Sequence, residues 1–88
     1  MEAKEAYEAI VADIEADPSK RILSRRFEEQ AFGSFAVSFK SGSDARCVIN
    51  DRGFVFVTDD VEGIGEATPT VPSLHDHEPG SLLQALKL

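Results

Sequence analysis

The chain has 88 residues, of which 42% are hydrophobic and 28% charged, and its formal net charge is −7. This length supports one core of about two layers, so we expect a single domain over residues 1–88 and exclude a separate cofactor-binding domain. The negative charge disfavours binding to a phosphate backbone or to an anionic membrane surface. We therefore expect no nucleic acid and no membrane as partner.

The charge is distributed unevenly along the chain. Residues 1–17 carry six acids and one lysine (net −5), residues 18–52 seven bases and four acids (+3), and residues 53–86 six acids and no lysine or arginine (−6). The acidic ends can contact the basic middle within one chain or between two chains. An acidic protein of this kind favours a basic macromolecular partner.

Residues 3–16 are predicted to form an amphipathic helix, because they are rich in alanine, glutamate and lysine. Apolar residues recur there at steps of three and four, which places them on one face. They are Ala3, Tyr7, Ile10, Val11 and Ile14. Pro18 ends the helix, since the residue before a proline is disfavoured in helical geometry.

Residues 18–32 have two interpretations. Asp17-Pro18 is typical of a helix start, which predicts a short helix or turn near 18–24 and a strand near 25–32. The alternative is an extended chain from Ile22 to Phe32 that leads into the next strand.

Residues 33–40 are predicted to form a half-buried strand. Phe35, Val37 and Phe39 alternate there with small or polar side chains. Residues 41–44 contain serine, glycine and aspartate, which indicate a turn.

A second hairpin is predicted over residues 45–58. Asn50-Asp51-Arg52-Gly53 matches a type I turn whose glycine takes the left-handed conformation. The turn joins a strand at 45–50 to a strand at 54–58, and the latter is apolar on both faces. We expect Ala36, Val48, Val55 and Val57 on the second face of the sheet, with Phe54 and Phe56 on either face.

The last thirty residues are less regular. Residues 59–80 contain many glycines, prolines and acids, and residues 67–74 fit an edge strand interrupted by prolines. Residues 81–88 are predicted to form a short helix with Ser81 as its cap.

These elements predict an α+β fold. It consists of an antiparallel meander of three to four strands over about residues 25–58, an N-terminal amphipathic helix (about 3–16) packed on one face, and a short C-terminal helix (about 81–88).

Few residues in the sequence indicate chemistry. The lone cysteine, Cys47, lies in an apolar run and is typical of a buried side chain. His75 and His77 alternate in a loop, but a metal site needs three or four ligands, which would have to include Asp59, Asp60 or Glu62. We therefore expect no catalytic, metal or cofactor site.

The sequence favours a small acidic, non-catalytic domain that binds a protein or associates with a second copy of itself. A homodimer is one form of this self-association. Its expected partner-binding residues are Asp59, Asp60, Glu62, Glu66, Val55 and Val57. The alternative is a metal- or ligand-binding protein or enzyme that uses the region of His75, His77, Asp59 and Asp60. The N-terminus lacks a signal-peptide pattern and the longest apolar run has four residues, so we expect a cytoplasmic protein.

Overall fold

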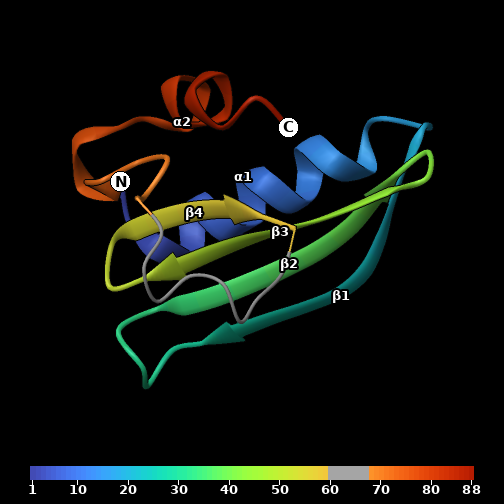
Figure 1. Cartoon of the computed structure of the whole chain (residues 1–88). Helices are drawn as coiled ribbons and strands as arrows, with labels where there is room; N and C mark the ends of the chain where they lie inside the picture. Colours follow the sequence, from blue (N-terminus) through green and yellow to red (C-terminus); the bar gives the residue numbers. More distant parts are fainter. Residues whose placement is uncertain (60–67) are drawn as a thin grey trace.

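One four-stranded antiparallel sheet packs against two helices in the computed structural model of the chain, which describes residues 1–59 and 68–88 (Figure 1). In chain order the elements are α1 (Ala3–Glu15), β1 (Lys20–Glu28), β2 (Ser34–Ser41), β3 (Asp44–Asp51), β4 (Phe54–Thr58), the 3-10 helix η2 (Leu74–Asp76) and α2 (Pro79–Leu86). The strands are ordered β1-β2-β3-β4, so each pairs with its neighbour in sequence. The predicted α+β fold is therefore confirmed.

Both α-helices lie on the same face of the sheet (Figure 1). The buried residues of α1 are Ala6, Ile10, Val11 and Ile14, as its periodicity predicts. Tyr7 extends this contact, because its ring lies 5.3 Å from that of Phe27 in β1 and 5.5 Å from that of Phe35 in β2. Within the two described ranges, no helix is long and apolar enough to cross a membrane.

The chain enters β1 earlier than the first interpretation predicted. The Asp17 carboxylate accepts hydrogen bonds from the backbone N–H and the hydroxyl of Ser19, at 2.9 and 2.7 Å. This short turn leaves the chain extended from Lys20, and residues 29–33 form turns instead of strand. The predicted helix or turn near 18–24 is therefore only a turn at residues 18–19, and the predicted strand near 25–32 instead spans Lys20–Glu28, so the extended alternative is closer.

The hairpin registers decide which side chains face the helices. Val37 lies opposite Val48, and Val48 lies opposite Val57, so these three share the helix-covered face. Phe56 lies opposite Ile49 on the other face. The expectation that Val48, Val55 and Val57 line the uncovered face is therefore wrong, although Ala36 does lie there.

The β3–β4 turn differs from the predicted type. Asp51 pairs with Phe54, so only Arg52 and Gly53 form the loop, and their φ angles are 55° and 92°. Two positive φ angles are typical of a type I′ turn, whose twist matches that of the flanking strands. The left-handed glycine was predicted correctly, and the left-handed arginine was not.

The C-terminal segment closes one edge of the sheet. Val71 exchanges two backbone hydrogen bonds with Val55 (2.8 and 3.0 Å), which makes a single bridge beside β4 and not the predicted edge strand. The helix α2 then begins two residues before Ser81, with Glu78 as its N-cap and Ser81 at its third position. Ser81 therefore takes part in a capping box and is not the N-cap itself.

Candidate functional site

A cavity of about 530 Å³ lies at the end of the sheet where the β1–β2 and β3–β4 turns meet the N-terminus of α1 and η2. Its walls come from these four segments. The lining residues are Ala3, Phe32, Asn50, Arg52, Gly53, Leu74 and His75. Leu74, Asn50 and Gly53 are buried, whereas Phe32 and Arg52 are exposed and form its rim.

Asn50 holds the two turns together beneath this cavity. Its side-chain Nδ2 donates to the carbonyl of Gly33 at 3.1 Å, and its Oδ1 accepts from the backbone N–H of Gly53 at 3.0 Å. The side chain is only 1% exposed, and these bonds partner both of its polar atoms. Asn50 therefore fixes the shape of the cavity and leaves no buried polar atom unpaired.

A close contact between Gly33 and Ala3 fixes another side of the cavity. A Cβ atom on Gly33, whose φ is 71°, would lie 2.6 Å from the Cβ of Ala3. Only glycine therefore allows the β1–β2 turn to approach the start of α1 this closely.

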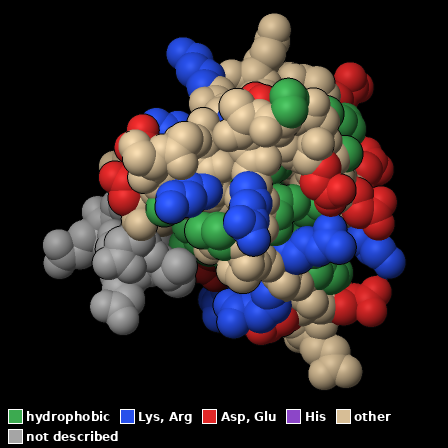
Figure 2. All heavy atoms as spheres, turned by 90° about the vertical axis from the view of Figure 1, so that its right-hand side faces the viewer, with side chains coloured by type: hydrophobic (Ala, Val, Ile, Leu, Met, Phe, Trp, Pro, Cys, Tyr) green, Lys and Arg blue, Asp and Glu red, His purple; other side chains and the backbone are tan. Residues whose placement is uncertain are grey.

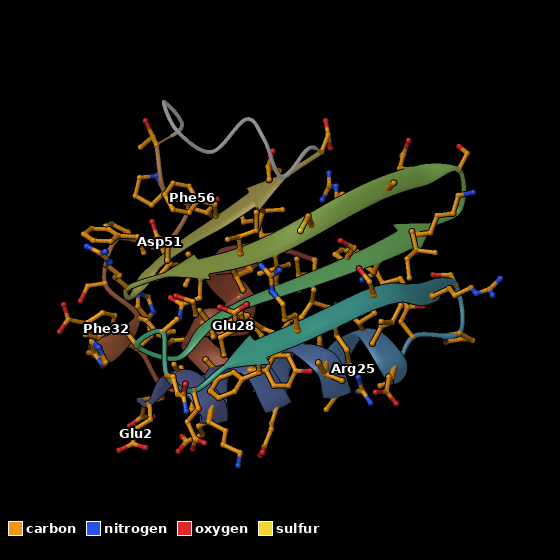
Figure 3. All side chains as sticks on the ribbon, turned by 90° about the horizontal axis from the view of Figure 1, so that it is seen from below. Glu2, Arg25, Glu28, Phe32, Asp51 and Phe56 are labelled. Atoms are coloured by element: carbon orange, nitrogen blue, oxygen red, sulfur yellow. The ribbon has the colours of Figure 1, made fainter. Side chains whose placement is uncertain are left out.

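Two exposed residues with left-handed backbone conformations, Phe32 and Arg52, lie next to each other at the rim of the cavity. Phe32 has a φ of 57° and is 78% exposed, and Arg52 has a φ of 55°. The Arg52 guanidinium carbon lies 5.7 Å from the centroid of the Phe32 ring, which is a cation–π contact. Figure 3 shows Phe32 and Asp51 at this end of the sheet, away from Arg25.

The histidines do not form a metal site with their described neighbours. The Nδ1 atom of His75 lies 3.2 Å from the Met1 carbonyl oxygen, and that of His77 lies 3.2 Å from the Ser81 hydroxyl. Among the residues that the structure describes, no three histidine, cysteine, aspartate or glutamate side chains are close enough to hold an ion. The ring edge of His75 instead packs along Gly53.

The acidic residues predicted for partner binding lie elsewhere. β4 runs away from Gly53, which lies beside His75. Asp59 follows the end of this strand and therefore lies roughly 20 Å from His75. Asp60, Glu62 and Glu66 lie outside the described residues. Cys47 is buried and faces away from the helices.

The two predicted valines belong to the core. Val55 is fully buried, and Val57 is partly buried against the same cluster under the helices. The helices thus enclose Val55, whereas Val57 keeps part of its surface exposed.

A second polar surface lies at the opposite end of the sheet, where β1 begins. Arg21 and Lys40 are exposed and directly opposite each other on β1 and β2, and Arg46, whose register partner is the buried Phe39, is exposed on the other face of the same end. We call these three residues the basic end. Figure 2 faces this side, where lysine and arginine side chains surround hydrophobic ones.

The other bases of β1 are already paired. Lys20 contacts Asp17 at 3.5 Å, Arg25 contacts Glu15 at 3.3 Å, and Arg26 contacts Glu28 at 3.1 Å. In the described part of the chain, no carboxylate forms an ion pair with any member of the basic end. Glu15 and Asp17 of the acidic N-terminal region therefore neutralise part of the basic middle, whereas the basic end has no ion-pair partner among the described residues.

The cavity is not predictable from the sequence, because it depends on contacts between segments far apart in the chain, and Phe32 and Arg52 stand there only as strand-end and turn residues. The basic pairs Lys20-Arg21 and Arg25-Arg26, in contrast, are visible in the sequence. Four such charges can hold a phosphate or an acidic peptide, although neutralisation of the acidic termini is the interpretation that the sequence favours. Searches against family models, curated proteins and solved structures find no match to this chain.

Proposed function

We propose that this chain is a protein-binding domain that adds an extended, acidic segment of another protein to the free edge of β1. The observation that carries the proposal is the facing pair of Arg21 and Lys40, two exposed cations in register with no carboxylate partner among the described residues. Like charges directly opposite each other destabilise a sheet, and a bound carboxylate removes that repulsion.

The backbone of β1 supports this mode of binding. The strand has nine residues and is terminal in the sheet, and six of its residues are exposed. The other edge of the sheet, at β4, is bridged by Val71. An unpaired strand edge presents alternating N–H and C=O groups to an extended peptide.

An irregularity in β1 adds an apolar contact. The register shifts between Ile22 and Ser24, so Leu23 is the extra residue of a bulge and remains 53% exposed. A bulge at a sheet edge redirects a side chain. Leu23 thus offers the partner an apolar contact close to Arg21.

The charges of β1 and of the whole chain determine which kind of partner can bind. Pairing β1 with β1 of a second copy would bring four basic residues of each strand together, which is unfavourable. The net charge of −7 opposes a nucleic acid as the anionic partner. The sequence alone favoured a basic partner for the whole chain, whereas the gathering of bases at one end favours an acidic segment there.

The test uses a blocked peptide of alternating valine and glutamate, about as long as β1, titrated into ¹⁵N-labelled protein. We expect amide shifts in β1 and at the end of β2, slower hydrogen exchange at the outer amides of β1, and weaker binding at high salt. A peptide of alternating valine and lysine is the charge control.

The double variant Arg21→Glu and Lys40→Glu should weaken binding of the glutamate peptide at least about tenfold. The double variant Lys4→Glu and Lys87→Glu, two exposed charge reversals outside the sheet with the same total change in charge, is the matched control and should leave affinity unchanged. Equal binding of both peptides, or unchanged affinity of the Arg21→Glu and Lys40→Glu variant, would disprove the proposal.

A further inference from the structure

We infer that the cavity between the sheet turns binds a small aromatic carboxylic acid, with its ring against Phe32 and its carboxylate on the Arg52 guanidinium. This site lies at the opposite end of the sheet from the basic end and is independent of the proposed peptide binding. Three features support it: the shape of the cavity, its aromatic rim, and a cation with no ion-pair partner in the described part of the chain.

The size and lining of the cavity suit a small organic molecule. A volume of about 530 Å³ lies in the range of small-ligand pockets, about 300–1,000 Å³. Ala3 and Leu74 provide apolar walls, and Asn50 at the base has no polar atom left to satisfy. Recognition by polar side chains therefore falls to the exposed lining residues Arg52 and His75.

Phe32 provides a platform for a planar ring. A phenylalanine with φ of 57° is strained, and 78% of it is exposed to water. The turn thus holds the ring outward, where its described ring contact is with Arg52. A stacked aromatic ligand would bury this apolar surface, which is favourable.

Arg52 provides the charge that a carboxylate needs. Its guanidinium lies beside the Phe32 ring and makes no ion pair with the described carboxylates. A planar guanidinium binds a carboxylate through two parallel N–H donors. With both groups at one rim, an aromatic acid engages ring and cation together.

The surrounding charges favour a singly charged ligand. Glu2, Asp51 and Asp76 are neighbours in sequence of lining residues and oppose a strongly negative group, while the Met1 ammonium, which donates to the His75 carbonyl at 3.3 Å, adds one positive charge. Arg52 is the one arginine or lysine among the lining residues, whereas a phosphate needs several donors. The geometry therefore fits a carboxylate better than a phosphate.

The test uses 2-naphthoate as the probe and 2-naphthamide, its neutral analogue, as the control. In ¹H–¹⁵N spectra, 2-naphthoate should shift the amides of Gly33, Gly53, Leu74 and His75 in a saturable manner. The naphthamide should bind at least about tenfold more weakly. The amides of β1 near Arg21 should not move.

The variant Arg52→Asn removes the guanidinium while keeping a residue that tolerates the left-handed backbone, so the turn should still form. It should weaken 2-naphthoate binding at least about tenfold, and Phe32→Asn should do the same. Arg46→Asn, at the opposite end of the sheet, is the matched control and should have no effect.

Three results would overturn the inference. These are no saturable shift with 2-naphthoate, equal affinity for acid and amide, or unchanged affinity in a folded Arg52→Asn protein. None of them bears on peptide binding at β1, so the two proposals fail separately.

Discussion

Asn50 shows how one side chain organises an end of the molecule. It is the one buried polar side chain among the described residues, and it joins the turn at Gly33 to the turn at Gly53. The sequence indicates a turn at Asn50, since asparagine is common at turn starts. Its bond to Gly33 was not predictable, because it spans a separation of 17 residues.

Asn50→Ala should lower the free energy of unfolding by about 1–3 kcal/mol, because the variant leaves the Gly33 carbonyl and the Gly53 N–H without their partner. Urea denaturation measures the change. Asp51→Ala, an exposed neighbour, is the control and should change it by no more than about 0.5 kcal/mol. Equal effects of the two variants would contradict the bridging role of Asn50.

Asp17 provides a pH-dependent contact. Hydrogen bonds from the hydroxyl and then the backbone N–H of Ser19, followed by Lys20, lower the pKa of Asp17 below its ordinary 3.8. A lowered pKa in the folded state means that the contact stabilises the protein above about pH 4 and is lost as pH falls through the folded-state pKa.

A ¹³C NMR titration of the carboxyl groups checks this shift. In Ser19→Ala the pKa of Asp17 should rise toward 3.8 but stay below it, because the backbone N–H of residue 19 still donates. In urea-unfolded protein it should reach its ordinary value. An unchanged pKa in Ser19→Ala would show that the hydroxyl is not the main cause.

At the scale of elements, the strand register determines which side chains face the helices where the hydrophobic periodicity does not. The alternation in residues 33–40 predicted the buried face of β2 correctly. The strand β4 is apolar at four consecutive positions, so its pattern does not distinguish its faces. The two-residue turn at Arg52-Gly53 places Val55 inward and Phe56 outward.

The helix α2 depends on its cap and on its docking. It has eight residues, fewer than an isolated helix needs, and it buries Leu82 and Leu86. The Ser81 hydroxyl accepts from the backbone N–H of Glu78 at 3.0 Å, while the Glu78 side chain accepts from the backbone N–H of Ser81. This reciprocal pair holds the first turn of the helix.

Ser81→Ala should therefore lower the free energy of unfolding by about 1 kcal/mol, the usual effect of losing a capping hydroxyl. Thermal unfolding followed by circular dichroism measures it. Gln84→Ala, at an exposed position of the same helix, should be neutral or slightly stabilising, since alanine favours helices. A neutral Ser81→Ala would mean that packing alone holds α2.

At the scale of the whole molecule, the fold separates two surfaces. The β1–β2 and β3–β4 turns meet at one end of the sheet, and the β2–β3 turn lies at the other (Figure 1). The cavity lies at the first end and the basic end at the second. A chain with a net charge of −7 thus presents a local cluster of positive charge.

Tyr7 reports on the integrity of the molecule, because the chain has one tyrosine and no tryptophan. Its ring joins α1 to β1 and β2 through Phe27 and Phe35. For a domain of this size we expect the near-UV signal of Tyr7 and the far-UV signal of the backbone to be lost in one urea transition. Tyr7→Phe is the control that assigns the near-UV signal. An earlier loss of that signal would show that α1 detaches before the sheet unfolds.

The sequence by itself determined the elements whose signal is local. The periodicity of α1, the alternation of β2 and the glycine of the β3–β4 turn each depend on residues close in the chain. Only the tertiary structure decided the faces of β4, the start of β1 and the grouping of Phe32 with Arg52, because these depend on register and on contacts between distant segments. The basic end arises in the same way, since Arg21 and Lys40 become neighbours only when β1 pairs with β2.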